Sequence, residues 1–404
     1  MALYDRILVY FLVYMEHIRL DIKSFSNPSG KFVKNFDGHL TFIPNDLPPD
    51  ITYDASLITL IAEASNQLGE LSGIGRLLPN PHLIIRPYVL REAVLSSKIE
   101  GTQASILDLF RYGADVAYSS LDRERKQMDE VVNYVDAVDI CLRKIQKENK
   151  PVNLKMILDA HKILLAGVRG HELEPGVIRN IQNWIGPEGT KIENATYVPP
   201  AVEYVPNLLQ NLENFILDPP GRIPPLIQCA VLHYQFESIH PFTDGNGRIG
   251  RLIIPLILAE RNLLSQPLLY LSMYIESHKT EYYSLLLQVS KESKWNDWIK
   301  FFLRAIIAQA RDAILNIQQL MDLKQKYDEQ LRSKKASASV LQLLDLLLAN
   351  PWVTITKVQD YLGVTYPPAK KAVEYLVSVG ILREVENKER NRLFVAHEIN
   401  DIVS

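Results

Sequence analysis

The sequence predicts a mainly α-helical protein that carries one small β-hairpin and a C-terminal winged helix-turn-helix domain. Three observations support this fold class. Apolar residues recur at helical spacing through most of residues 55–332, turn residues separate two short β-prone runs within 184–200, and the chain changes character after residue 336. At 404 residues the chain is longer than a single core usually supports, so we expect two or three domains.

The composition is that of an ordinary globular protein, with 47% hydrophobic and 23% charged residues. A formal net charge of −3 provides no bulk attraction to nucleic acid or to an anionic membrane. The only cysteines, Cys141 and Cys229, lie within apolar helical patterns, so we expect neither a disulfide framework nor a cysteine metal site. These features favour a reducing, cytoplasmic location.

The first residues contain a short apolar run, Ile7 to Met15. A helix that spans a bilayer needs about 20 apolar residues. Acidic residues flank the run and no small-residue cleavage site follows it, so we expect neither a membrane anchor nor a signal peptide. Two interpretations stay open: an ordinary buried helix, or an over-extended start upstream of a true initiator at Met15.

Residues 24–53 are rich in Ser, Asn, Gly and Pro, and we expect them to form an extended lead-in rather than a core element. Helical periodicity begins at Ala55. A further helix is predicted from Tyr88 to Ile99, where Gly101 supplies a C-terminal stop. The other helical patterns cover 124–149, 153–167, 203–217, 224–238, 247–261, 277–290 and 294–332.

The tail is predicted to fold as three short helices followed by a charged hairpin, the pattern of a winged helix-turn-helix. Gly363 is expected to end the second helix and Gly380 the third. The predicted helices are 341–348, 355–362 and 367–379, and the predicted strands are 381–385 and 393–395.

The most informative segment is residues 240–251, His-Pro-Phe-Thr-Asp-Gly-Asn-Gly-Arg-Ile-Gly-Arg. His240 follows a predicted helix, and a neutral histidine can accept a proton near physiological pH. Asp244 offers one carboxylate, which is how Mg²⁺ is usually held when substrate phosphates supply other ligands. The small residues Gly245-Asn246-Gly247 let backbone N–H groups converge on an oxyanion, and the N-terminus of a helix there adds positive potential.

Arg248 and Arg251 are three residues apart and project from one face of the first helical turn. Guanidinium groups match phosphate oxygens in geometry, so this pair suits further phosphates. Each residue alone has a simpler explanation, as a structural histidine, an Asp-Gly turn or a solvated basic face. Their combination within twelve residues favours a site that handles the phosphates of a nucleotide.

This spacing resembles the Fic family motif, H-P-F-x-[D/E]-G-N-[G/K]-R-x-x-R, at every defined position. The resemblance implies a Fic-type helical fold and an enzyme that transfers AMP from ATP to a Ser, Thr or Tyr hydroxyl of a protein, which could be the chain itself. It implies that His240 deprotonates the hydroxyl and that Asp244 holds Mg²⁺, with Mn²⁺ as an alternative. The nucleotide-binding positions that it implies are Phe242, Thr243, Asp244, Gly245, Asn246, Gly247, Arg248 and Arg251, the last on the γ-phosphate.

The resemblance also suggests how the chain divides. We expect an N-terminal segment at 1–35, a helical region with an inhibitory helix at 36–119 and a Fic catalytic core at 120–310. A helical connector at 311–335 and a winged-helix-like domain at 336–404 would complete the chain.

Two flanking regions extend the resemblance. The predicted hairpin at Thr196, Tyr197, Val198 and Pro199 resembles the family's flap, which aligns a target segment by strand-like backbone pairing. A plain surface hairpin is the alternative. Tyr282 lies in an aromatic stretch of the kind that usually packs in a core, but family precedent suggests a contact with adenine.

A candidate inhibitory segment, residues 96–101, precedes the motif. Ser96 and Glu100 are four residues apart and share a helix face, so the hydroxyl can orient the carboxylate, and Gly101 lets the chain turn afterwards. Alone, this is an ordinary helix terminus. Beside the motif it resembles the inhibitory helix of Fic proteins, [S/T]-x-x-x-E-[G/N], which implies that Glu100 competes with the γ-phosphate for Arg251 and that the resting protein is autoinhibited.

Other functions stay open at this point. Glu100 could position water for removal of AMP, and the motif does not encode the base of the donor nucleotide, so another nucleotidyl transfer is an alternative. The tail could instead make the chain a DNA-binding regulator. Acidic residues offset its basic ones, which favours protein docking or homodimerisation over DNA binding. The basic residues concerned are Lys370, Lys371, Lys388, Arg390 and Arg392.

Overall fold

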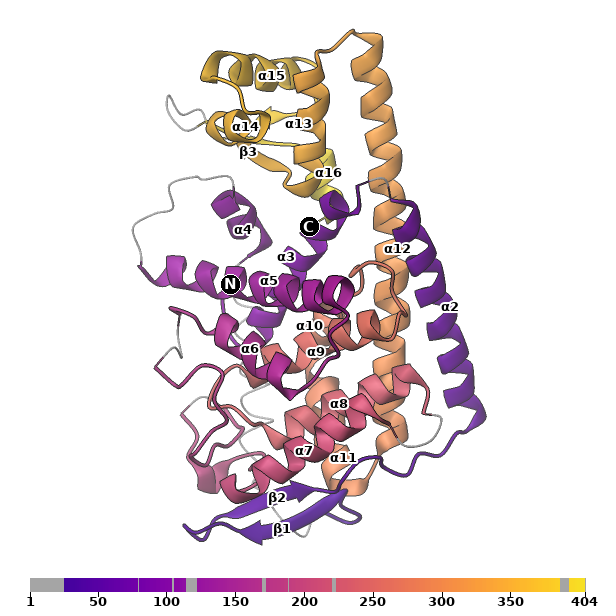
Figure 1. Cartoon of the computed structure of the whole chain (residues 1–404), viewed down its shortest axis with the longest axis vertical. Helices are drawn as coiled ribbons and strands as arrows, with labels where there is room; N and C mark the ends of the chain where they lie inside the picture. The colour runs from indigo at the N-terminus through magenta and orange to yellow at the C-terminus, as the bar shows by residue number, and fades with distance from the viewer. Residues whose placement is uncertain are drawn as a thin grey trace, which may run out of the picture.

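A long helix, α12 (Trp295–Ser333), runs along one side of the molecule and joins its body to its tail (Figure 1). Helix α2 (Ala55–Leu77) packs along it. The computed structural model describes residues 25–78, 80–103, 105–113, 122–168, 172–187, 189–219, 223–385 and 392–403. The apolar run at 7–15 and the wing residues Lys388 and Arg390 lie outside these ranges.

The predicted connector at 311–335 is not a separate element, because α12 continues through it to Ser333 without a break. Buried residues recur at steps of four and three along the helix, so its apolar face does not end at the predicted boundary of residue 310. They include Ile306, Ala310, Ala313, Ile317 and Leu320.

The body contains nine further described helices. Six of them match predicted helical patterns to within a few residues, and a seventh, α3, matches only in part. Helix α3 begins at Pro81, earlier than the predicted start at Tyr88, because Pro87 is accommodated inside it. The two that were not predicted, α4 and α10, are too short to show periodicity. The helices are α3 (Pro81–Ile99), α4 (Ile106–Gly113), α5 (Asp122–Glu148), α6 (Leu154–Leu164), α7 (Val205–Leu217), α8 (Pro225–Ile239), α9 (Asn246–Glu260), α10 (Ser272–Ser277) and α11 (Lys279–Glu292).

Helices α8 and α9 form the centre of the body. They pack against each other, and almost every side chain on them is buried. A helix that is buried on all sides belongs to the core of a large domain. Residues 240–245, which join these helices, are therefore held from both ends by the core.

Residues 24–53 were wrongly predicted to be an extended lead-in without a core role. Strands β1 (Gly30–Lys34) and β2 (Leu40–Pro44) form an antiparallel hairpin that crosses the predicted boundary at residue 35. Phe42 is fully buried and its ring packs against Phe25 and Phe32. The many turn residues obscured two short β-prone runs whose aromatic side chains supply the burial.

The tail has the predicted order of three helices and a hairpin. These elements are α13 (Ala338–Ala349), α14 (Ile355–Leu362), α15 (Tyr366–Ser378), β4 (Arg383–Glu384) and β5 (Leu393–Val395). Gly363 and Gly380 adopt positive φ angles of 62° and 82° at the predicted stops. Two short elements were not predicted: β3 (Trp352–Thr354), which joins an antiparallel sheet of order β3-β5-β4, and α16 (His397–Val403).

Both cysteines are buried and free, as the sequence suggested. Among the described residues, none of the helices is both long enough and apolar enough to cross a bilayer.

Candidate active site

The loop between α8 and α9 carries the candidate catalytic residues. His240 follows α8 and Gly245 precedes α9, with positive φ angles of 50° and 80°. Such an angle is uncommon for histidine and easy for glycine. The carbonyl oxygen of His240 accepts hydrogen bonds from Arg179 Nε at 2.9 Å and from Asn183 Nδ2 at 3.2 Å. Neither residue stood out in the sequence, because both lie in an irregular segment that matches no motif.

The ring of His240 is oriented for proton transfer. Its Nδ1 lies 3.2 Å from the backbone oxygen of Glu237. A carbonyl oxygen only accepts, so Nδ1 carries the proton and the lone pair of Nε2 is available as an acceptor. Burial lowers the pKa of His240 to about 4, although the Glu237 carbonyl and the charge of Glu100 act in the opposite direction. The imidazole is therefore neutral at physiological pH, as a general base requires.

Asn246 shapes the loop with its side chain. Its Nδ2 donates to the Phe242 carbonyl and its Oδ1 accepts from the Phe242 N–H, both at 2.8 Å. The buried Phe242 ring stacks on His161 at a centroid distance of 3.7 Å. His161 in turn donates from Nε2 to the Asp244 carbonyl at 2.9 Å. The Asn246 side chain is thus occupied by Phe242, and the Phe242 ring is packed in the interior; their contacts with a nucleotide stay predictions.

Asp244 is suited to a metal that phosphates help to bind. Its side chain is 31% exposed, beside the half-buried Thr243. One carboxylate oxygen, Oδ1, accepts from the Gly245 N–H at 2.6 Å and lies 3.6 Å from Arg248 Nη2. No group of three or more metal-binding side chains occurs within the described ranges. A lone, partly exposed carboxylate fits Mg²⁺ with substrate phosphates and does not fit a self-sufficient metal centre.

The predicted anion cradle lies at the start of α9. The first N–H groups of a helix have no partner within the helix, and they concentrate positive potential there. Gly247 lies in this first turn, and a Cβ atom added to it would overlap the carboxylate of Glu100. The Glu100 carboxylate therefore lies against the first turn of α9, where the motif is expected to bind an anion.

Arg251 binds the end of α3 through three hydrogen bonds. Its Nη2 donates to Glu100 Oε1 at 2.7 Å and to the Ser96 carbonyl at 2.9 Å, and its Nε donates to Ser96 Oγ at 2.9 Å. The Ser96 hydroxyl thus orients the arginine, whereas the sequence suggested that it would orient Glu100. Burial alone would raise the pKa of Glu100, but the charge and hydrogen bond of Arg251 outweigh it and lower that pKa. Gly101 turns the chain immediately afterwards, with φ at 94°.

Arg248 does not extend into solvent as a basic face would. It is 1% exposed and lies 3.7 Å from Glu130 Oε2 and 3.6 Å from Asp244 Oδ1. Its three guanidinium nitrogens are buried without a hydrogen bond of normal length. A buried cation with unused donors next to the cradle is consistent with a role in binding an anion.

Two family models match the chain where this geometry lies. The model described as Fic/DOC family N-terminal matches residues 58–142, which contain Ser96 and Glu100, and the Fic/DOC family model matches 151–258, which contain the whole motif. The chain thus contains two regions that match Fic/DOC family models.

Relatives of this chain include a protein adenylyltransferase of Caenorhabditis elegans, 31% identical over 132 residues that cover 31% of the chain and 24% of the relative. A probable protein adenylyltransferase of Aquifex aeolicus is 33% identical over 103 residues, which cover 26% of this chain and 32% of the relative. The crystal structure of a Fic family protein from Desulfovibrio desulfuricans G20 has a TM-score of 0.55 at 20% identity and covers 87% of this chain and 98% of that one. That similarity establishes the fold. The matched segments of this chain span about a quarter of the length of the first curated relatives.

The expected Fic flap is not a regular hairpin. Residues 184–200 are joined by one antiparallel bridge, Ile185 with Tyr197, and contain a short 3-10 helix at 192–194. Tyr197 is buried and its hydroxyl bonds Ser238, while the Val198 carbonyl accepts from the N–H of Phe42 in β2 at 2.9 Å. Turns every few residues, ending in Pro199-Pro200, prevent longer strand pairing. The side chains of Tyr197, Val198 and Pro199 are buried, whereas Trp184 is 43% exposed.

Tyr282 is part of the core of the Fic body. It is 1% exposed, and its hydroxyl lies 2.8 Å from Nε2 of His233. Its ring packs against Trp298 and Tyr283. The adenine contact suggested by family precedent therefore has no support from its position.

Proposed function

We propose that this chain is an autoinhibited protein adenylyltransferase that transfers AMP from ATP to a Ser, Thr or Tyr hydroxyl of a protein. The observation that carries the proposal is the position of Glu100, which lies against Gly247 at the anion cradle and binds Arg251. A carboxylate at this place mimics a phosphate in charge and in hydrogen bonding.

In the proposed reaction the target hydroxyl donates its proton to Nε2 of His240, which the Glu237 carbonyl keeps available as an acceptor. The hydroxyl oxygen then bonds to the α-phosphorus, and the bond from that phosphorus to the bridging oxygen of the β-phosphate breaks. Pyrophosphate leaves with the electron pair. Positioning and charge stabilisation supply most of the acceleration in such a displacement.

The protein groups that stabilise the phosphates are the first turn of α9 and its two arginines. Arg251 would bind the γ-phosphate once Glu100 withdraws, and Arg248 would contribute its unused donors. Asp244 would hold Mg²⁺, or Mn²⁺, which neutralises phosphate charge when bound. Withdrawal of Glu100 is thus required before ATP can bind in a productive geometry.

The test compares wild type, Glu100→Gly, His240→Ala and the double variant with ATP labelled at the α- or the γ-phosphate. Glu100→Gly should raise incorporation of the α-label into protein at least about tenfold, because a coupling of 1.4 kcal/mol already gives that factor. The γ-label should not be incorporated, and labelled GTP, CTP and UTP test the donor base. The proposal fails if Glu100→Gly leaves incorporation unchanged, if His240→Ala preserves it, or if the γ-label is transferred.

Hydrolysis of an AMP-protein ester is a second candidate, since the charge of Glu100 acts on His240 across the site. Glu100 would then hold a water molecule for attack on phosphorus. The check is to label a target with the Glu100→Gly variant and add wild type. Release of AMP by wild type and not by Glu100→Gly would establish this activity, and a stable label would exclude it for that target.

A further inference from the structure

Helix α3 presents a row of four polar residues to the rest of the body. Tyr88, Glu92, Ser96 and Glu100 are spaced by four and so lie along one face of the helix. The last two bind Arg251, as described above. The first two fasten the same helix to other elements, so the inhibitory contact is one end of a longer attachment.

Glu92 anchors the middle of α3. This 3% exposed carboxylate accepts hydrogen bonds from the Ser272 hydroxyl at 2.6 Å and from the Tyr134 hydroxyl at 3.1 Å. These partners belong to α10 and α5. Burial raises the pKa of Glu92 to about 7, against the lowering effect of its donors. The middle of the helix is therefore held to the body by a satisfied buried carboxyl.

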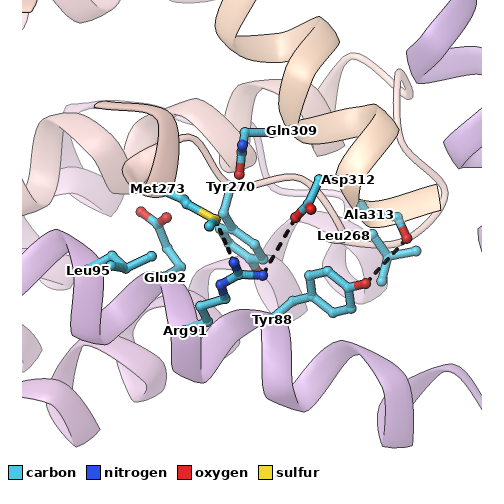
Figure 2. A pocket seen from close by; sticks show the side chains of 10 residues that line it. All are labelled: Tyr88, Arg91, Glu92, Leu95, Leu268, Tyr270, Met273, Gln309, Asp312 and Ala313. Carbon is cyan, nitrogen blue, oxygen red and sulfur yellow. Dashed lines mark hydrogen bonds and ion pairs between the residues drawn. The ribbon is translucent and has the colours of Figure 1, made fainter. Parts of the chain in front are cut away.

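The first part of α3 is attached to α12. The Tyr88 hydroxyl donates to the Ala313 carbonyl at 3.3 Å, and Arg91 lies 3.6 Å from Asp312, as the dashed lines in Figure 2 show. Both partners lie near the middle of α12.

The tail itself contacts this end of α3. Helix α13 packs against α3, and β3 contacts α4, the helix that follows α3. The Asn350 side chain donates to the Phe110 carbonyl of α4 at 3.3 Å. Val403 of α16, 5% exposed, lines a small cavity together with Pro87 and Tyr88 of α3. Two tail helices and one tail strand thus support the inhibitory helix and its continuation.

Pro87 makes this end of α3 a natural pivot. Proline has no N–H, so the hydrogen bond to the carbonyl four residues earlier is missing inside the helix. Helices bend at such positions. Pro87 lines the same small cavity as Val403 of the tail.

We propose that the tail, residues 338–403, controls the active site by holding α3 in its inhibitory position. When α13 and α16 are docked on α3, Glu100 stays on Arg251 and blocks the cradle. When they are displaced, residues 88–100 pivot at Pro87 and Glu100 withdraws. This inference rests on the proposed function for its enzymatic readout, and it adds the element that receives the signal.

The test introduces Val403→Asp into the full chain, which places a charge at the buried contact with Pro87 and Tyr88. AMP transfer should rise by roughly 5- to 150-fold, the range of common couplings between sites. Val403→Asp added to Glu100→Gly should give no further rise, because both changes act through the same contact. Amide hydrogen exchange of residues 88–100 should become faster in Val403→Asp without any nucleotide.

The matched control is Val377→Asp, the same change on the exposed surface of α15, where the side chain is 37% exposed. It should alter neither transfer nor exchange. Asn350→Ala removes the tail's bond to α4 together with the bond that Asn350 Oδ1 accepts from the Trp352 N–H, and it should act in the same direction as Val403→Asp, more weakly. Circular dichroism and thermal unfolding establish that each variant is folded.

The possible failures are distinguishable. If Glu100→Gly gives no transfer, the proposed function fails, and hydrogen exchange still tests the coupling. If Glu100→Gly is active and neither Val403→Asp nor Asn350→Ala raises transfer, the inference is overturned, even where exchange in α3 becomes faster.

Discussion

Glu100 and Arg251, which are 151 residues apart in the chain, form a hydrogen-bonded ion pair at 2.7 Å between the end of α3 and helix α9. The arginine is 2% exposed and the glutamate side chain 32% exposed, so the pair is buried on the arginine side and open on the other. An anion that enters from the open side meets the carboxylate before the guanidinium. In the proposed function, this contact blocks the phosphate site without destroying it.

Gly247→Ala tests whether removal of Glu100 is sufficient for activity when the proposed phosphate site itself is damaged. The added methyl group overlaps the Glu100 carboxylate and the space for a phosphate. We expect ATP affinity to fall at least about tenfold, a loss of 1.4 kcal/mol. The double variant Gly247→Ala/Glu100→Gly should remain inactive. Calorimetry with ATP and Mg²⁺ and transfer assays measure both effects.

The control for this change is Gly73→Ala, a helical glycine in α2 with open space around its Cβ position. It should leave ATP affinity unchanged. Transfer by the double variant as fast as by Glu100→Gly alone would contradict the assignment of Gly247 to the cradle.

The pH dependence of the released enzyme follows from His240. The base must be unprotonated, and burial lowers its pKa from 6.5 to about 4. Removal of Glu100, whose charge raises that pKa, shifts it no higher. The initial rate of Glu100→Gly should therefore stay level as the pH falls from 8 through 6.5 and decline only near pH 4. Initial rates in a constant-ionic-strength buffer series measure this, and a midpoint near 6.5 would show that the ring is solvated in the active form.

Tyr282→Phe distinguishes a core role from an adenine contact. Nδ1 of His233 faces the Gly250 carbonyl at 3.0 Å and must carry the proton, so Nε2 accepts from the Tyr282 hydroxyl. Loss of that hydroxyl leaves a buried acceptor unsatisfied and should lower the free energy of unfolding by about 1–3 kcal/mol. Denaturant unfolding and the KM for ATP give the two readouts.

The comparison variant is Tyr53→Phe, where the residue is 44% exposed and stability should not change. A higher KM for ATP in Tyr282→Phe with unchanged unfolding would restore the adenine interpretation.

The tail should bind duplex DNA weakly. Lys370 lies 3.7 Å from Glu374, and Arg392 Nε donates to Glu384 at 2.6 Å, so both basic residues are offset by acidic neighbours. Non-specific affinity depends on the phosphates that a protein neutralises. The full chain should be retained on DNA only at low salt. As the salt concentration rises, retention should be lost well below 0.15 M. Retention that persists at physiological salt, and is lost in Lys370→Ala, would assign the tail to DNA.

Sequence patterns were sufficient where the relevant groups lie close together along the chain. The spacing of His240, Asp244 and Arg251 implies their shared place around a helix start, because helix geometry converts short spacing into position. The long periodic helices could be predicted for the same reason. The hairpin β1–β2 and the short helices α4 and α10 were not predicted, since a few residues carry too little periodicity.

The sequence by itself predicted the helical body and carried the resemblance to the Fic motif at residues 240–251. Only the tertiary structure decided that Ser96 orients Arg251. The same holds for the hydrogen bonds of the Asn246 side chain to the Phe242 backbone and for the place of Tyr282 in the core. The tertiary structure also decided that the tail supports α3. These relationships join elements far apart in the chain or depend on which donor meets which acceptor. Packing selects among such pairings, and local spacing does not encode the result.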